Sequence, residues 1–165
     1  MAATHMPMLH MICGKVAAGR STFAARLAAA PGTIIIAQDS WRATLCPQEV
    51  RSHADYRRLL PRLRAVMGPH AAALLRVGLS VVLDWPASTV ASRAWLRGIF
   101  EAAGAGHRLH VLDVPDALCL ARLMARNATG THAYTVNREE LETLAGTFEP
   151  PTQAEGFDMV AHAGR

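Results

Sequence analysis

A glycine-bounded segment near the amino terminus carries residue types that bind phosphate. It reads Gly-Lys-Val-Ala-Ala-Gly-Arg-Ser-Thr over residues 14–22 and fits the pattern GxxxxG[K/R][S/T]. The glycines allow the backbone to curl until successive N–H groups point inward, which creates an anion site at a helix amino terminus. In such a loop the hydroxyl of Ser21 is placed to ligate Mg2+, and the side chain of Arg20 reaches the β- and γ-phosphates. The segment predicts a nucleoside triphosphate site made by Gly14, Lys15, Val16, Ala17, Ala18, Gly19, Arg20, Ser21 and Thr22.

Arg20 is an arginine at a position where such loops normally have lysine. Arginine keeps the positive charge, but its guanidinium is a wide planar fork and not a compact ammonium. It can hold phosphate and yet fit poorly over a transition state, and Lys15 could supply compensating charge. We therefore predict nucleotide binding, with Arg20 as a catalytic contact to phosphate, and leave the question of turnover open.

Two aspartates follow predicted strands. Asp39 comes after Thr33–Ala37, and Asp84 comes after Leu79–Leu83. In an open α/β sheet the ligand lies beyond the carboxyl ends of the strands. Asp39 is therefore placed to accept a proton from a substrate hydroxyl, and Asp84 to hold a magnesium-bound water. The structural alternatives are a helix cap for Asp39 and a turn former for Asp84, and we favour the functional interpretation for both.

The arginines form two further groups. Arg122 and Arg126 lie four residues apart and hence on one face of a predicted helix. Phosphoryl transfer needs cations around the oxygens of the moving group, so both are candidate catalytic residues, with a solvated basic face as an equal alternative. The second group consists of Arg51, Arg57, Arg58, Arg62 and Arg64. It could contact an anionic substrate, but we favour a solvated surface.

Alternating apolar runs and amphipathic segments predict the elements that position these residues. Strands are expected at residues 9–13, 33–37, 79–83, 107–112 and 157–161. Helices are expected at residues 21–30, 47–60, 63–77, 89–103, 116–126 and 137–147. The second and third helices should be interrupted at Pro61 and at Gly68-Pro69. The unbroken apolar run at 33–37 predicts a strand buried on both faces.

This alternation of strands and helices predicts a three-layer α/β/α sandwich with a five-stranded parallel sheet. The sequence has no internal repeat and no linker rich in glycine, serine or proline. Residues 1–165 are therefore expected to form one domain. The polar stretch at about 127–136 has no periodicity and is expected to form a lid.

Composition narrows the class of protein. Hydrophobic residues make up 51% of the chain, but the longest apolar runs are far below the about 20 residues needed to span a bilayer. Residues 1–7 lack the features of a secretory signal, so a cytoplasmic location without membrane contact is expected. The cysteines Cys13, Cys46 and Cys119 form no CxxC pair and are expected to be core residues. The net charge of +4 fits a nucleotide ligand and also fits RNA binding.

These residues together resemble small P-loop kinases. The similar group includes chloramphenicol phosphotransferase, zeta toxin, gluconate kinase and the kinase half of polynucleotide kinase, which have an AAA-type ATP-binding domain. The resemblance rests on Gly14–Thr22, Asp39-x-x-Arg42, Val82-Leu83-Asp84, Cys119–Asn127, Phe148–Pro151 and Glu155-Gly156-Phe157.

The resemblance implies a P-loop NTPase fold with a sheet ordered 2-3-1-4-5. It also implies that Asp39 is the catalytic base and that Arg42 lies beside it in the substrate site. Arg122 and Arg126 would be lid arginines that grip phosphates or stack on adenine, with Arg126 in contact with the nucleotide. None of these motifs identifies the acceptor of the phosphoryl group.

Three functions remain open. The favoured one is transfer of the γ-phosphoryl group of ATP to a hydroxyl of a small molecule, with ATP and Mg2+ as cofactors. Arg20 favours the second, a nucleotide-binding protein with little or no turnover. The arginines at 51–64 favour the third, a nucleic-acid-end kinase, but few aromatic residues lie among them. Expected partners are a nucleotide and a small-molecule acceptor, nucleic acid is not favoured, and the chain is expected to be a monomer or homodimer.

Overall fold

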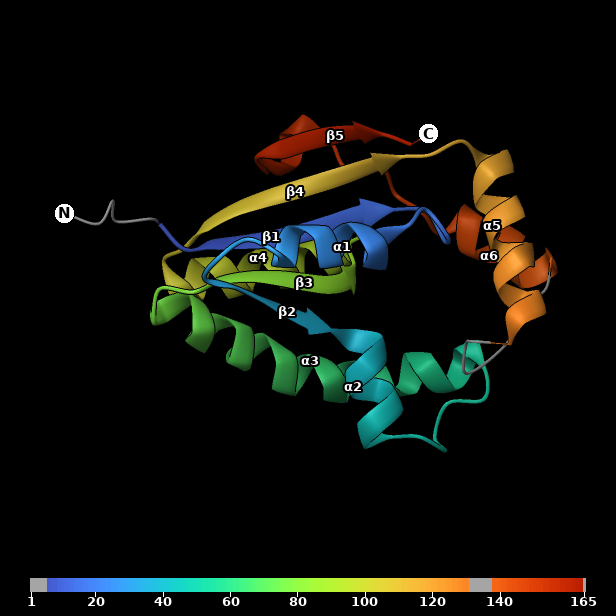
Figure 1. The fold of residues 1–165 in the computed structure, drawn as a ribbon, viewed down its shortest axis with the longest axis horizontal. Helices are drawn as coiled ribbons and strands as arrows, with labels where there is room; N and C mark the ends of the chain where they lie inside the picture. The colour runs from blue at the N-terminus through green and yellow to red at the C-terminus, as the bar shows by residue number, and fades with distance from the viewer. Residues whose placement is uncertain (1–5, 131–137, 165) are drawn as a thin grey trace.

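Five parallel strands form the centre of the molecule (Figure 1). A computed structural model describes residues 6–130 and 138–164. Its strands are β1 (Met8–Gly14), β2 (Thr33–Ala37), β3 (Ser80–Pro86), β4 (Gly106–Asp113) and β5 (Met159–Ala163). They lie in the order β2-β3-β1-β4-β5, and each neighbouring pair is parallel. The predicted α/β class and the predicted order 2-3-1-4-5 are confirmed.

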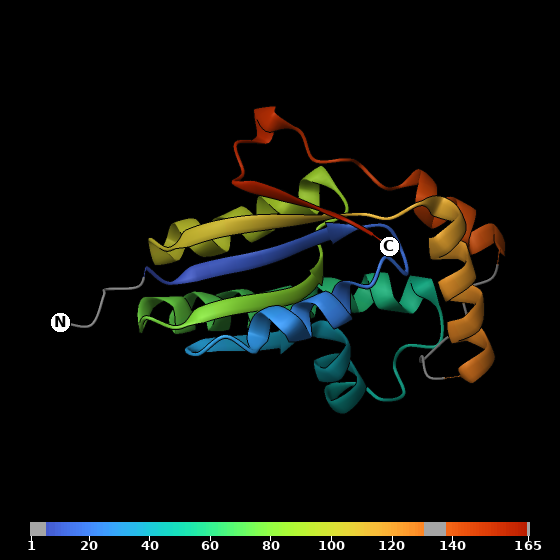
Figure 2. The same cartoon turned by 45° about the horizontal axis from the view of Figure 1, so that its top comes forward.

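Helices cover both faces of this sheet. They are α1 (Arg20–Ala28), α2 (Gln38–Leu45), α3 (His53–Arg76), α4 (Val90–Ala103), α5 (Asp116–Thr129) and α6 (Arg138–Gly146). Helix α1 lies on one face, and α3 and α4 pack together on the other (Figures 1 and 2). Helices α5 and α6 lie beyond the carboxyl ends of the strands. In the described chain, no helix has the length and apolar character required to cross a membrane.

The central strand β1 is buried on both faces. Leu9, Met11 and Cys13 belong to the core shared with α3 and α4, whereas Ile12 belongs to the core shared with α1 and α5. All four side chains are fully buried. This two-sided packing fixes the end of β1 and therefore the start of the segment that follows it, which is the glycine-bounded loop.

Strand β2 departs from its prediction. Its bounds match, but Ile34 and Ile35 are 41% and 38% exposed, so the expected burial on both faces is wrong. The reason is position, because β2 is an edge strand that pairs only with β3. Ile36 alone of the three isoleucines is buried in the core.

Helix α3 was expected as two interrupted helices and is one continuous helix of 24 residues. Pro61 and Pro69 both lie inside it, although proline removes a backbone hydrogen bond and clashes with the preceding turn. The buried side chains recur every four residues at Leu59, Leu63, Met67, Ala71 and Leu75. Burial of this unbroken stripe against the sheet and α4 offsets the cost of the prolines.

Helix boundaries also differ near the expected lid. Helix α5 continues to Thr129 and ends at Gly130, which has φ 64°. Residues 127–129 are therefore helical, and the rest of the expected lid falls largely at 131–137, outside the described residues. Between β2 and α3 the sequence suggested no helix before residue 47, whereas α2 begins directly after β2.

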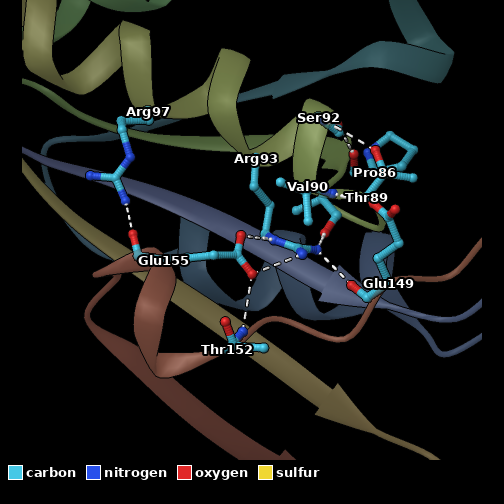
Figure 3. A network of polar contacts seen from close by, with 10 residues as sticks. Pro86, Thr89, Val90, Ser92, Arg93, Arg97, Glu149, Thr152 and Glu155 are labelled. Atoms are coloured by element: carbon cyan, nitrogen blue, oxygen red, sulfur yellow. Dashed lines mark hydrogen bonds and ion pairs between the residues drawn. The ribbon is translucent and has the colours of Figure 1, made fainter.

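A buried arginine anchors the carboxyl-terminal segment (Figure 3). Arg93 of α4 has no exposed side-chain surface, and its Nε and Nη2 donate to Glu155 at 2.7 and 3.0 Å. Its Nη1 donates to the carbonyls of Ala87 and Glu149 at 2.9 and 2.8 Å. Glu155 also accepts from the backbone N–H of Thr152 at 3.0 Å. These contacts lower the pKa of Glu155, with the hydrogen bond from Arg93 as the main cause.

We expect Glu155→Ala to lower the free energy of unfolding by about 3–5 kcal/mol, because it leaves the buried guanidinium of Arg93 without its partner. Urea unfolding followed by circular dichroism measures this change. The matched control is Glu49→Ala, which removes an exposed ion pair with Arg62 and should cost at most about 1 kcal/mol. Equal losses for the two variants would contradict the anchoring role.

Three histidines form a row across β1, β4 and β5. The Nδ1 of His10 lies 3.0 Å from the Nε2 of His110, whose Nδ1 lies 3.0 Å from the Nε2 of His162. The ring of Phe23 from α1 packs against His110 and His162. Burial lowers the pKa of His110 to about 4, and the neighbouring histidines act in the same direction.

This row should make stability depend on pH. His110 has an ordinary pKa of 6.5 and a folded-state pKa of about 4, so the unfolded chain binds its proton more tightly. The neutral form therefore stabilises the fold fully above pH 6.5, and this contribution of up to about 3 kcal/mol is lost as the pH falls toward 4. In urea unfolding at stepped pH, His110→Gln should flatten this dependence and exposed His70→Gln should not. An unchanged slope in His110→Gln would contradict the assignment.

Candidate active site

The loop after β1 has the geometry of an anion nest. Its backbone turns sharply, since the N–H of Ala18 donates to the carbonyl of Lys15 at 3.1 Å. Ala17 and Gly19 have φ of 60° and 93°, in the left-handed region. A Cβ on Gly14 would lie 3.1 Å from the Cβ of Ala18 and 3.3 Å from the Cβ of Leu112. The two glycines are therefore required by a backbone turn and by a close approach. Successive N–H groups in such turns create a concave site for anions.

Helix α1 begins at Arg20, directly after this loop. Gly19 is the N-cap and forms no side-chain capping hydrogen bond, and the first turn contains no acidic residue. Positive charge from the helix dipole is therefore not neutralised by an acid within the helix itself. The loop and the helix start together favour a negatively charged group at this point.

A cavity of about 650 Å³ opens beside the loop, at the carboxyl ends of β1 and β3. The residues predicted from sequence that line it are Lys15, Val16, Arg20, Ser21, Asp39, Arg42, Asp84 and Arg126. The fold therefore brings together in one cavity the loop, both predicted aspartates and one of the two lid arginines. A cavity of this size is typical of small-molecule sites.

Asp39 and Arg42 form a pair on the first turns of α2. The Nη2 of Arg42 donates to Oδ1 of Asp39 at 3.2 Å. Arg42 is 7% exposed and Asp39 is 59% exposed, so a buried guanidinium holds a carboxylate that faces the cavity. The N-cap of α2 is Ala37, which rules out the alternative of a capping role for Asp39.

Asp84 lies within β3 and not in a turn after it. It is paired in register with Ala37 of β2, the last residue of that strand, and Asp39 follows two residues later. The two aspartates therefore lie at the same edge of the sheet. The turn-former alternative is therefore wrong for Asp84. Its side chain is partly buried and lines the cavity.

Lys15 and Arg122 have contacts that the sequence did not indicate. The Nζ of Lys15 is in contact with Oδ1 of Asp116, the first residue of α5, and this hydrogen bond raises the pKa of Lys15. Lys15 is thus partly neutralised by an acid, which reduces its capacity to compensate for Arg20. Arg122 is not among the residues that line the cavity, and its Nη1 donates to the carbonyl of Ala18 at 3.4 Å. It contacts the backbone of the loop.

Four of the five arginines in the second group divide into two sets, and Arg51 is exposed and does not line the cavity. Arg58 is paired with Asp55 and Arg62 with Glu49 on the surface, as the solvated interpretation predicts. Arg57 and Arg64, in contrast, line the cavity together with His53, Tyr56 and Leu60. These five positions are spaced as one face of a helix, but the expected break at Pro61 separated Arg64 from the other four.

Two further contacts shape the cavity and were missed. The hydroxyl of Tyr56 donates to Oε1 of Gln38 at 3.1 Å and joins α3 to α2. The hydroxyl of Ser88 donates to the carbonyl of Gly14 at 3.2 Å and joins the segment after β3 to the loop. A single sequence contains no pattern of serine or tyrosine residues from which these contacts could be predicted.

Comparison with known proteins identifies the family. A family described as an AAA domain matches residues 9–151, which is most of the chain. The chain belongs to the AAA domain family. Among curated proteins, none matches the sequence.

Solved structures share the fold of this AAA domain. A candidate kinase from Chloroflexus aurantiacus aligns with a TM-score of 0.78 and 16% identity over 98% of this chain and 87% of that chain. A sugar kinase from a Janibacter species has a TM-score of 0.66 and 17% identity over 96% and 86%. The Mycobacterium tuberculosis APS kinase CysC, in complex with AMPPNP and APS, has a TM-score of 0.61 and 21% identity over 96% and 88%. The chain therefore shares the fold of these three kinases.

Two glycines allow a test of the loop. We expect Gly19→Ala to weaken ATP binding at least about tenfold, because φ of 93° is strained for alanine and relaxation would turn the N–H groups away from the ligand. Gly32→Ala is the matched control, since Gly32 also has positive φ but lies in the turn before β2. Both should lose roughly 1–2 kcal/mol of stability, while only Gly19→Ala should lose affinity in calorimetric titration. Equal affinities would contradict the assignment of the loop.

Proposed function

We propose that this AAA domain is a kinase that transfers the γ-phosphoryl group of ATP to a hydroxyl group of a small molecule. The observation that carries the proposal is the position of the Asp39–Arg42 pair in the same cavity as the glycine-bounded loop. The loop supplies an anion site for the triphosphate, and the pair supplies a positioned base. A parallel sheet binds its ligand at this edge, which supports the same assignment.

The reaction follows from these two parts. The oxygen of the acceptor hydroxyl attacks the γ-phosphorus, the bond from that phosphorus to the bridging oxygen breaks, and ADP leaves. Asp39 takes the proton of the hydroxyl, and Arg42 holds the carboxylate in place for this role. Arg20 and Arg126 line the cavity and supply positive charge toward the phosphates.

Mg2+ fits the oxygen groups of this cavity. It is usually held by one or two protein oxygens together with phosphate oxygens, and Ser21 and Asp84 offer a hydroxyl and a carboxylate. Over residues 6–130 and 138–164, no group of three or more His, Cys, Asp or Glu side chains could hold a metal ion. We assign Ser21 and Asp84, which both line the cavity, as ligands that act together with the nucleotide. The ion would neutralise charge on the phosphates.

Arg20 favours a second function, nucleotide binding with little or no turnover. The wide guanidinium keeps the charge of the usual lysine but not its shape. A nucleic-acid-end kinase receives less support, because Arg58 and Arg62 of the second arginine group are already paired with acids.

Replacement of the base tests the proposed kinase. We expect Asp39→Asn to lower ADP release with a hydroxyl acceptor by at least about 100-fold, because the amide cannot take the proton. ATP affinity should stay within about twofold, since the loop binds the triphosphate. The control is Asp158→Asn, at a surface position paired with Arg108. A large loss of ATP affinity in Asp39→Asn would contradict the role of a base.

Replacement of Arg20 decides between the two functions. If the guanidinium impairs turnover, Arg20→Lys should raise ADP release at saturating ATP by about tenfold, since the ammonium fits the transferring group better. Arg26→Lys, on the exposed last turn of the same helix, is the control. A fall in turnover would show that the site is adapted to arginine.

A further inference from the structure

The cavity extends beyond the phosphate loop to the wall formed by α3. This wall presents His53, Tyr56, Arg57 and Arg64, and Trp85 of β3 also lines the cavity. The loop and Asp39 account for the nucleotide and for the base, but they leave these α3 side chains without a role. What they could bind depends on which of their polar groups are already satisfied.

Arg64 is a fixed cation without an acidic partner among the residues that the structure describes. Its guanidinium carbon lies 5.7 Å from the ring centre of Trp85 and 5.1 Å from that of Trp95, so two rings hold it. Its Nε is buried and has no hydrogen-bond partner, and none of the ion pairs in the described chain includes Arg64. Burial lowers the pKa of Arg64, and only Tyr56 opposes this effect. A partly buried guanidinium with no carboxylate beside it favours the binding of an anion.

Other polar atoms on the same side of the cavity are also without partners. Nε of Arg42 is a buried donor with no hydrogen-bond partner in the described chain, and Nδ1 of His53, which donates or accepts according to its tautomer, also has none. Arg57 is exposed at the cavity and has no described acidic partner. The one amide oxygen here, Oε1 of Gln38, already accepts from Tyr56. The wall therefore offers donors and positive charge, and it requires acceptors and negative charge from whatever binds there.

We propose that the acceptor of the phosphoryl group carries an anionic oxygen group, a carboxylate or a phosphate, and that Arg64 and Arg57 bind this group. The proposal rests on the proposed kinase function, because it names the class of the second substrate. The guanidinium of Arg64 would bind the oxygens of the anion, while the hydroxyl of the same molecule lies toward Asp39. A neutral polyol would offer hydroxyl oxygens to these donors but no negative charge to oppose that of Arg57 and Arg64.

Calorimetric titration in the presence of saturating Mg2+ and AMPPNP tests this class, because the nucleotide analogue fills the loop and prevents anions from binding there. The probes are glycerol, glycerate and glycerol 3-phosphate, which share hydroxyl groups and differ in charge. At least one of the two anions should bind at least about tenfold more tightly than glycerol. Preference for glycerate indicates a carboxylate, and preference for glycerol 3-phosphate indicates a phosphate. Equal binding of all three, or binding of none, would overturn the proposal.

Substitutions of arginines in α3 test which side chains bind the anion. Arg64→Gln should weaken binding of the preferred anion by about 10–100-fold, because a charge-assisted hydrogen bond is lost. Exposed Arg57→Gln removes charge without disturbing the tryptophan contacts and should weaken binding by about threefold or more. Arg62→Gln, on the same helix but paired with Glu49, should leave it unchanged. If Arg64→Gln melts at the wild-type temperature and binds the anion equally well, the proposal is wrong.

Failure of this proposal can be distinguished from failure of the kinase function. If AMPPNP itself does not bind in the first titration, the proposed kinase function fails and the acceptor proposal fails with it. If AMPPNP binds and the anions show no preference over glycerol, only the anionic acceptor is excluded, and ADP release with other hydroxyl acceptors tests the kinase function separately.

Discussion

The buried ion pair between Arg93 and Glu155 determines where several segments of the chain meet. The guanidinium binds the carboxylate and also the carbonyls of Ala87 and Glu149, so one side chain joins α4, the segment after β3 and the carboxyl-terminal tail. The N–H of Glu149 donates to the carbonyl of Ser88, and the hydroxyl of Ser88 donates to the carbonyl of Gly14 at the start of the phosphate loop. A charge that is costly to bury thus acts through a short series of hydrogen bonds on the loop that would bind the nucleotide. Thr147 and Phe148, which precede the anchored segment, line the cavity.

The arginines of the chain differ in how their charge is satisfied. Arg58, Arg62 and Arg108 form exposed ion pairs, which contribute little to stability. Arg93 has its charge and all its described donors satisfied within the fold. Arg64 lines the cavity, is held by aromatic rings and has a buried Nε without a hydrogen-bond partner in the described chain. The basic residues that line the cavity outnumber its acidic residues, which suits a nucleotide and an anionic acceptor; the basic ones are Lys15, Arg20, Arg42, Arg57, Arg64 and Arg126, and the acidic ones are Asp39, Asp84, Asp116 and Glu142.

The sequence was sufficient for the fold class and the loop, because both depend on local patterns. Apolar runs and the GxxxxG spacing have fixed meanings for strands and for phosphate loops, and the strand order followed from the family resemblance. It failed where tertiary packing decides the outcome. Pro61 and Pro69 indicate breaks, yet the buried stripe of α3 continues through them. The consecutive isoleucines of β2 are typical of a strand in the middle of a sheet, but the strand order places β2 at the edge.

The candidate site was predictable to a similar degree. Asp39 and Asp84 could be placed at the cavity because strand ends of a parallel sheet meet at one edge, and the family resemblance placed Arg42 beside Asp39. Asp116, Tyr56 and Arg64 could not be found, because their roles depend on contacts between helices that one sequence does not specify. Arg57 and Arg64 lay in a group for which a solvated surface was favoured, and only the continuous course of α3 separates them from Arg58 and Arg62.

Isothermal titration of the protein with ATP, with and without Mg2+, followed by measurement of ADP in the same samples, tests the central claim most directly. Binding of one ATP per chain, strengthened by Mg2+, with ADP formed once a hydroxyl acceptor is added, is the result that this account predicts. Binding without ADP formation for any acceptor would favour a nucleotide-binding protein without turnover. Absence of binding would mean that Arg20 has abolished the function of the loop, and it would contradict the account.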